Sequence, residues 1–186
     1  MKLKYNYFLL LIYFLGQSVS GAENIFLYKG TFSRAIEVKE LDKFNTTNKA
    51  SKKLKNLIKI TNQNERELHK ILTLEIEVPL KTSSKLLNSK IGEVFLSRLS
   101  KIIYPNKITN KKLSIKAMRS GILVSSFRNK QKVNLIDFFK AYPNENVAID
   151  LNALSKTLKK VESLKELIKF YSDLPLKKLK DGRSST

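Results

Sequence analysis

The sequence of 186 residues contains no cysteine, one histidine, six glycines and four prolines. Without cysteine the protein can form no disulfide, no thiolate metal site and no cysteine nucleophile, and it offers no cysteine for lipid attachment. The few glycines form neither a P-loop nor a Gly-x-Gly-x-x-Gly pattern, so the common glycine-rich loops that hold phosphate groups are missing. These absences exclude thiol chemistry and the best-known modes of nucleotide binding.

Acidic residues are also scarce. The chain has 16 Asp and Glu against 36 Lys and Arg, a formal net charge of +20. This charge predicts attraction to anionic surfaces, but only six of the basic residues are arginine, the side chain expected where forked contacts to phosphate are made. Because the lysines lie along the whole chain, we interpret them mainly as solvated faces. An anionic envelope surface is a predicted partner, and nucleic acid is not.

No recognisable catalytic group is present. His69 is the only histidine and follows Leu68 on a predicted amphipathic helix, where a surface position is favoured over a catalytic role. The chain has no Gly-x-Ser-x-Gly sequence, and Gly121 and Ser125 are two residues too far apart for a nucleophile elbow. We therefore predict no catalytic residue, no metal ligand and no cofactor, and we expect no enzyme. The alternative is a weak or unusual hydrolase that uses Ser125 or Ser126 without a recognisable base.

Two other sets of side chains allow more than one interpretation. Glu75 and Glu77 would share one face of a strand, as a catalytic carboxylate pair could, but alternation with apolar neighbours favours a solvated strand face. Aromatic rings beside lysines could stack on nucleic-acid bases, yet most occupy the apolar stripes of predicted helices, which favours the core. These aromatic residues are Phe95, Phe138, Phe139, Tyr142 and Tyr171.

The first 22 residues differ from the rest of the chain. Lys2 and Lys4 precede a short apolar run, and Ser20 and Ala22 occupy the −3 and −1 positions of a cut after Ala22. This order is typical of a secretory signal peptide, and the apolar run is shorter than the ~20 residues of a membrane span. We predict a signal peptide at 1–22, a single domain at 23–174 and a disordered basic tail at 175–186.

The location that follows is secreted or periplasmic. The alternative is a membrane anchor formed by an uncleaved signal. No later segment is apolar enough to span a bilayer, so no transmembrane helix is expected after signal cleavage.

The remaining pattern predicts an α+β fold that is mainly helical. Runs 24–28 and 32–38 are rich in Ile, Phe, Tyr and Val and flank a turn at Gly30, which predicts a β-hairpin. Short strands are expected at 74–78 and 147–149, and we expect both to join the hairpin in one small sheet. Amphipathic helices fill the spaces between these strands.

Polar residues that can cap a helix mark the expected helix starts. They are Asn64, Ser89, Thr109 or Asn110, Asn134 and Asp150. The helix after residue 110 is apolar over much of its surface and is expected to be the buried central one. A stripe through Leu87, Ile91, Val94, Phe95, Leu99 and Ile102 is expected to face the core, and the helix after Asp150 is expected to end at Leu174.

Three segments carry an ordered series of motifs. The first has Tyr28, Gly30, Phe32, Ser33, Ile36 and Val38 in the hairpin. The second is 86–93, which contains Lys90, and the third is 134–137 followed by Ala141-Tyr142-Pro143. Together they resemble the N-terminal domain of unknown function found in secreted cyanobacterial alpha/beta-hydrolase-like proteins, in which proline is common at the position of Lys90. The resemblance covers about 23–171 and implies a domain that stands here without the catalytic domain that follows it in many relatives. The alternative is a divergent alpha/beta-hydrolase-related enzyme with no recognisable triad.

The function expected from these observations is that of an exported, non-catalytic domain that binds a protein or the cell envelope. The resemblance implies one specific protein partner, a hydrolase catalytic domain supplied by another chain. It implies no activity for the domain itself.

Overall fold

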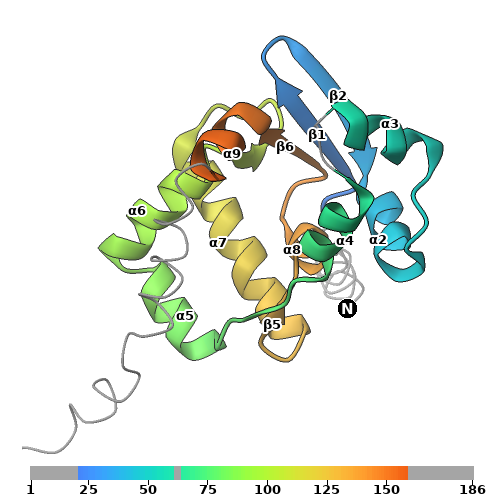
Figure 1. Ribbon diagram of the computed structural model, residues 1–186. Helices are drawn as coiled ribbons and strands as arrows, with labels where there is room; N and C mark the ends of the chain where they lie inside the picture. The colour runs from blue at the N-terminus through green and yellow to red at the C-terminus, as the bar shows by residue number, and fades with distance from the viewer. Residues whose placement is uncertain (1–20, 61–63, 159–186) are drawn as a thin grey trace, which may run out of the picture.

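The computed structural model describes residues 21–60 and 64–158, and Figure 1 shows how they are arranged. Within these ranges the strands are β1 (Asn24–Lys29), β2 (Phe32–Glu37), β3 (Ile76–Glu77), β4 (Ile103–Pro105), β5 (Lys132–Val133) and β6 (Asn146–Asp150). The helices are α2 (Val38–Thr47), α3 (Lys52–Ile60), α4 (Glu65–Thr73), α5 (Leu80–Leu87), α6 (Lys90–Leu99), α7 (Lys111–Arg128), α8 (Leu135–Ala141) and α9 (Leu151–Leu158). The predicted α+β fold with mainly helical content is confirmed.

Several predictions from the sequence fall outside these ranges. They concern most of the predicted signal peptide, at 1–20, and the predicted basic tail, at 175–186. The predicted continuation of the last helix from 159 to 174 also lies outside the described residues.

The predicted hairpin forms one side of a four-stranded mixed sheet. β1 and β2 pair antiparallel, from Asn24 opposite Glu37 to Lys29 opposite Phe32. Gly30 has a φ of 61°, a backbone region that glycine enters without a Cβ clash, and this allows the tight turn. β6 lies parallel to β1 and antiparallel to β4, so the strand order is β2-β1-β6-β4.

The predicted strand at 74–78 does not join this sheet. Only Ile76 and Glu77 form a strand, β3, which pairs with β5 in a separate two-stranded sheet. Instead, β4 forms the edge strand of the main sheet beside β6. The sequence pattern does not predict this strand. β4 has three residues and ends in Pro105, so it is too short to show an alternating pattern.

Side-chain caps begin the helices at the predicted positions. Asn64 Oδ1 accepts a hydrogen bond from the Glu67 N–H at 2.8 Å, at the start of α4. Asn134 Oδ1 accepts one from the Asp137 N–H at 2.9 Å, at the start of α8. Such bonds satisfy backbone donors that a helix start leaves open. The same role is confirmed for Ser89, Asn110 and Asp150.

The prediction that one apolar stripe over 87–102 faces the core is wrong for the residues in the middle of the stripe. Ile91 and Val94 are 62% and 55% exposed, whereas Leu96 is fully buried. The helical structure is interrupted between α5 and α6, and Ser89 caps the new helix. Because the break restarts the helical phase, one stripe drawn through both helices assigns the wrong face of α6 to the core.

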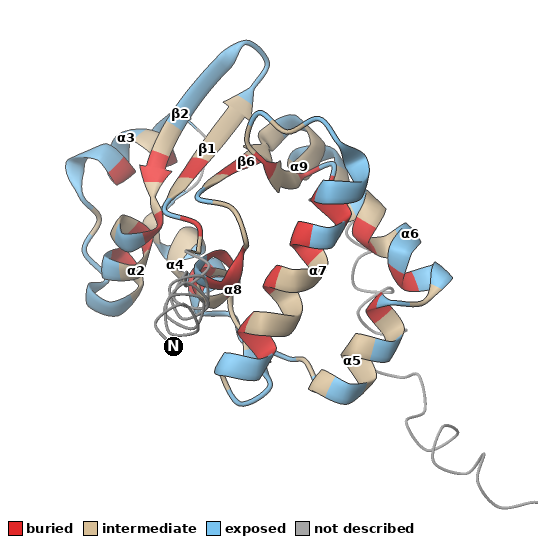
Figure 2. Ribbon diagram, turned by 180° about the vertical axis from the view of Figure 1, so that it is seen from behind, coloured by how far each residue is buried: buried red, intermediate tan, exposed pale blue. Residues whose placement is uncertain are grey.

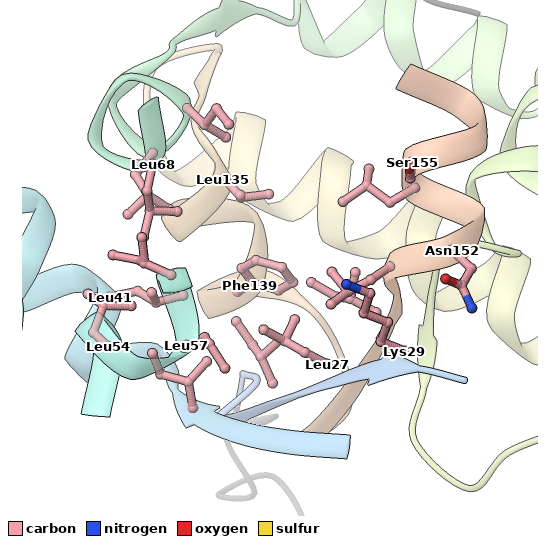
Figure 3. Close-up of a pocket in the computed structure, with 18 residues that line it drawn as sticks. Leu27, Lys29, Leu41, Leu54, Leu57, Leu68, Leu135, Phe139, Asn152 and Ser155 are labelled. Carbon is pink, nitrogen blue, oxygen red and sulfur yellow. The ribbon is translucent and has the colours of Figure 1, made fainter. Parts of the chain in front are cut away.

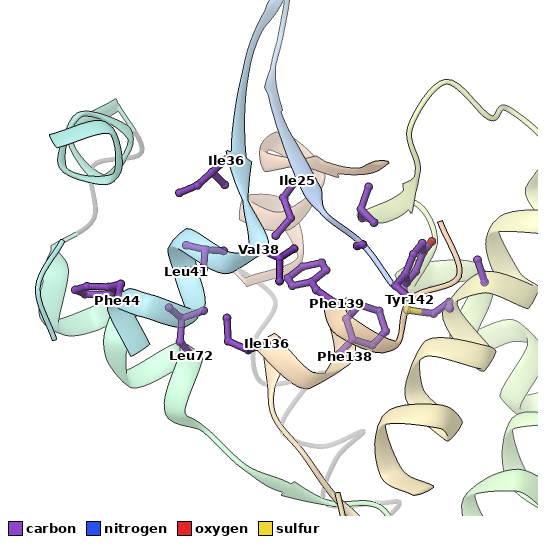
Figure 4. Packing of buried hydrophobic residues seen from close by; sticks show 14 of the residues in the cluster. Ile25, Ile36, Val38, Leu41, Phe44, Leu72, Ile136, Phe138, Phe139 and Tyr142 are labelled. Carbon is purple, nitrogen blue, oxygen red and sulfur yellow. The ribbon is translucent and has the colours of Figure 1, made fainter. Parts of the chain in front are cut away.

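α7 is the central helix, as predicted, and packs against α5, α6, α8 and β4. Its contact with α8 is close, because a Cβ on Gly121 would lie 2.9 Å from Phe138 Cε2 and 3.2 Å from Tyr142 Cδ2. Only glycine allows this approach. Burial along α7 does not follow apolar character alone, since Leu113 is 48% exposed while Ser125 is fully buried. Figure 2 shows buried residues along α7 where it faces the rest of the molecule, and Figure 4 shows the aromatic rings of α8 in the core.

Ala22 packs at the C-terminal end of α8. It is 6% exposed, and its N–H donates to Phe139 O at 2.9 Å. This bond uses one of the carbonyls that a helix end leaves open. Cleavage after Ala22 stays a prediction, and it would remove both the bond and the buried methyl group.

Candidate functional site

An apolar pocket of about 620 Å³ lies between the sheet and the helices around it. Its floor is formed by Ile25 and Leu27 of β1, with Ile36 of β2 and Ile149 of β6 beside them. Figure 3 shows α3 and α4 on one side of the pocket, α9 on the opposite side and Phe139 of α8 between them. The walls are lined mainly by leucines, among them Leu54, Leu57, Leu68, Leu135, Leu151 and Leu154.

The floor follows from the alternation of the strands. Side chains two residues apart in a strand point to the same face, so Ile25, Leu27 and Lys29 share one face of β1. Ile36 is the register partner of Ile25, and Ile149 is the partner of Leu27. Because register partners lie on the same face of a sheet, these side chains form one continuous apolar surface.

The walls follow from amphipathic helices that cannot bury their apolar faces completely. In α3, Leu54 and Ile58 are buried but Leu57 is only half-buried. In α9, Asp150 Oδ1 accepts hydrogen bonds from two N–H groups of the first turn, at 2.8 and 2.9 Å. The helix therefore starts directly after β6, and Leu154 on its inner side lines the pocket.

Polar side chains are few in the pocket, and they lie on β1 and α9. Among the lining residues that the structure describes, Lys29 is the only charged one, and Asn152 and Ser155 are the only uncharged polar ones. Figure 3 shows the Lys29 amine pointing from β1 toward the pocket, with Asn152 and Ser155 on α9. β1 and α9 pack against each other. None of the described residues that line the pocket is a histidine or a carboxylate.

His69 does not lie at this pocket, and it is half-buried rather than on the surface. Its ring meets the Phe44 ring edge-on, with centroids 5.7 Å apart and an interplanar angle of 87°. Its Nε2 is 3.1 Å from Asn45 O. These contacts join α4 to α2, which is a structural role, and they include no serine and no carboxylate.

The two candidate serines lie inside the core. Ser125 and Ser126 are both fully buried, and neither lines the pocket. Ser126 Oγ donates to Val78 O at 2.6 Å, which joins α7 to the segment after β3. Ser125 Oγ is buried without a hydrogen-bond partner among the described residues. A nucleophile needs access to its substrate, and this geometry supplies none for either hydroxyl.

The candidate carboxylate pair is solvated. Glu75 and Glu77 are exposed, and Glu75 Oε2 lies 3.4 Å from Lys132 Nζ with more than half of each side chain in solvent. In the part of the chain that the structure describes, no three His, Asp or Glu side chains gather as metal ligands. No described helix combines the length and the apolar character needed to cross a membrane.

The aromatic residues are largely in the core, as predicted. Phe138, Phe139 and Tyr142 are buried, Phe95 is half-buried, and Tyr171 lies outside the described residues. Two other aromatic side chains lie at the surface: Phe32 and Phe127 are each 74% exposed.

Sequence patterns identified the residues around the pocket but not the pocket itself. The alternation of β1 and the stripe of α3 predict which side chains turn inward. They do not predict whether the space between the inward faces is filled, because that depends on how far apart the elements lie. One feature of the sequence does indicate that this sheet face is not fully covered. Arg34 interrupts the apolar face of β2, and its side chain is exposed.

The fold and site together define a small helical α+β domain with an apolar pocket and no assembled catalytic centre among its described residues. Residues 21–150 match the family model described as alpha/beta hydrolase of unknown function (DUF1400). The chain therefore belongs to this family. No curated protein and no solved structure matches it.

Proposed function

We propose that the protein is an exported, non-catalytic binding domain whose pocket takes the apolar chain of an amphiphile from the cell envelope. The observation that carries the proposal is the pocket between the sheet and helices α3, α4 and α9. Its volume of about 620 Å³ lies within the ~300–1,000 Å³ typical of small-molecule sites.

The placement of polar groups favours an amphiphile over a wholly apolar ligand. Lys29, Asn152 and Ser155 lie where β1 meets α9, and the rest of the lining is apolar. Lys29 forms no ion pair with any described residue, so its charge is available to an anionic head group. An apolar chain along the leucines then contributes about 0.8 kcal/mol for each buried methylene.

The same lining argues for binding without turnover. A hydrolase needs a nucleophile activated by a base, and Ser155 is the only hydroxyl among the described lining residues. No described histidine or carboxylate lines the pocket beside it. We expect no activity on a panel of fluorogenic esters; activity that is lost in the Ser155→Ala variant would contradict this part of the proposal.

Displacement of a dansyl-labelled fatty acid by palmitate tests the binding. We expect the full-length protein to bind the probe and the Leu57→Trp variant, whose larger side chain occupies the pocket, to bind at least about tenfold more weakly, a loss of about 1.4 kcal/mol. The matched control is Val94→Trp, which places the same side chain on the exposed face of α6, 55% exposed in the native chain. This control should bind as the native protein does.

Two results would overturn the proposal. One is equal binding by both tryptophan variants, which would place the probe elsewhere. The other is probe binding that is absent in the full chain and gained when 159–186 are removed, because the chain's own residues would then fill the pocket. A hydrolase catalytic domain in another chain remains the predicted protein partner, and co-purification from the periplasm tests it.

A further inference from the structure

We propose that the tip of the β1–β2 hairpin, residues 29–34, docks the protein on an anionic lipid surface. The tip projects from the body of the molecule, and Figures 1 and 2 show it extending beyond the neighbouring helices. Every residue from 29 to 34 is exposed. The tip shares only Lys29 with the described lining of the pocket, and the proposal stands even where the pocket binds nothing.

Phe32 gives the tip its apolar contact. Its side chain is 74% exposed, whereas most of the described Phe and Tyr side chains are at least partly buried. Its register partner across the turn is Lys29, so both side chains lie on the same face of the hairpin. An exposed aromatic ring held on a rigid tight turn can enter the head-group region of a bilayer without ordering any further chain.

Two cations of the tip flank this ring. Arg34 is the register partner of Leu27, which places Arg34 on the same face as Phe32 and Lys29. The tip sequence Lys-Gly-Thr-Phe-Ser-Arg contains no aspartate or glutamate. An apolar side chain between two cations matches a surface of anionic head groups over acyl chains, where each cation contributes about 1 kcal/mol. A protein partner would not require an apolar side chain placed between two cations.

The tip is also continuous with the pocket face of the sheet. Lys29 belongs to the tip and also lines the pocket, and Leu27 and Ile25 lie beyond it along the same face of β1. A protein docked through the tip would hold the polar end of its pocket near the membrane. If the proposed function is also correct, an amphiphile could pass from the bilayer to the pocket along this face.

The absence of tryptophan from the chain allows a direct test with a single fluorophore. The Phe32→Trp variant of the full-length protein is mixed with vesicles of phosphatidylglycerol and phosphatidylcholine, and separately with vesicles of phosphatidylcholine alone. We expect a blue shift of the emission, and quenching by lipids with brominated chains, only with the anionic vesicles. Added salt should weaken the effect because it screens the charges.

Phe127→Trp is the matched control. Phe127 is also 74% exposed and has a cationic neighbour in Arg128, but it lies near the end of α7, far from the hairpin tip in Figure 1. Its indole should show neither the shift nor the quenching. Equal signals from both variants would overturn the proposal, because adsorption would then be a property of the whole basic surface.

Charge removal gives a second measurement. Lys29→Gln and Arg34→Gln should each weaken binding to the anionic vesicles about fivefold, while Lys132→Gln at the far end of the molecule should change it little.

A native protein that stays folded by circular dichroism yet does not sediment with these vesicles would overturn the proposal. So would self-association through the edge strand β2 that is abolished by Phe32→Ser and needs no lipid. Failure of the fatty-acid displacement assay leaves these outcomes unchanged, so the two proposals can fail separately.

Discussion

The two sides of α8 differ in how completely they are filled. On one side, Phe138 lies so close to α7 that a single methyl group on Gly121 would come within 2.9 Å of its ring. On the other side, Phe139 lines a pocket of about 620 Å³. The two phenylalanines are adjacent in the sequence and both are buried. Burial alone therefore does not distinguish a packed core from the wall of a binding site.

The largest expected effect comes from truncating one side chain on each side of α8. Phe138→Ala should lower the free energy of unfolding by about 3–5 kcal/mol, because it leaves a cavity in a packed region. Leu57→Ala should cost only about 1 kcal/mol, because this leucine already faces open space and is half-buried. Chemical denaturation measures both. Equal costs would mean that the pocket is filled in the native protein.

The N-terminal junction should have the next largest effect. A chain that begins at Gly21 keeps the bond from Ala22 N to Phe139 O, whereas a chain that begins at Glu23 loses it. We expect the shorter chain to be less stable by about 2 kcal/mol, from the lost hydrogen bond and the lost burial of Ala22. Thermal unfolding of the two chains measures this difference in stability. Equal stability would fit the predicted cleavage after Ala22.

Tyr142 on the packed side gives a smaller effect of opposite sign. Its side chain is fully buried, and its hydroxyl has no hydrogen-bond partner among the described residues. Tyr142→Phe should therefore raise the free energy of unfolding by about 1 kcal/mol. A destabilised variant would contradict this, since it would show that the hydroxyl has a partner, such as an ordered water.

The same residue predicts a dependence on pH. Burial raises the pKa of the Tyr142 hydroxyl far above its usual value near 10. At a pH above the unfolded pKa, the unfolded chain loses this proton while the folded chain keeps it, so stability falls as pH rises. The native protein should lose stability above about pH 10 more steeply than Tyr142→Phe. Parallel curves for the two proteins, measured by denaturation, would contradict the assignment.

The smallest effect is expected at the surface. Lys140 Nζ lies 2.7 Å from Asp42 Oδ2 and joins α8 to α2, with 48% and 35% of the two side chains exposed. Lys140→Gln should cost only about 0–1 kcal/mol, and less at high salt, because solvent screens an exposed pair. Unfolding measured at two salt concentrations checks this. A larger cost that salt does not change would show that the pair helps to hold the pocket wall in place.

Local features of the fold were predictable because their causes are local. The hairpin follows from two strand-forming runs around Gly30, and the starts of α4 and α8 follow from Asn64 and Asn134, whose side chains bond to N–H groups of the first turn. Errors arose where distant segments decide. Residues 74–78 alternate well, yet only two of them pair, because their partner is the short β5.

The lack of thiol chemistry, the basic charge, the family and most helix starts follow from the amino-acid sequence, because each depends on residue types or on neighbours within a few positions. The packing of distant elements decided which apolar faces meet and which leave a pocket between them. It also decided that Ser125 is buried and that Phe32 is exposed. These properties depend on the distance between elements far apart in the chain, and that distance is set by close packing at contacts such as Gly121 on Phe138.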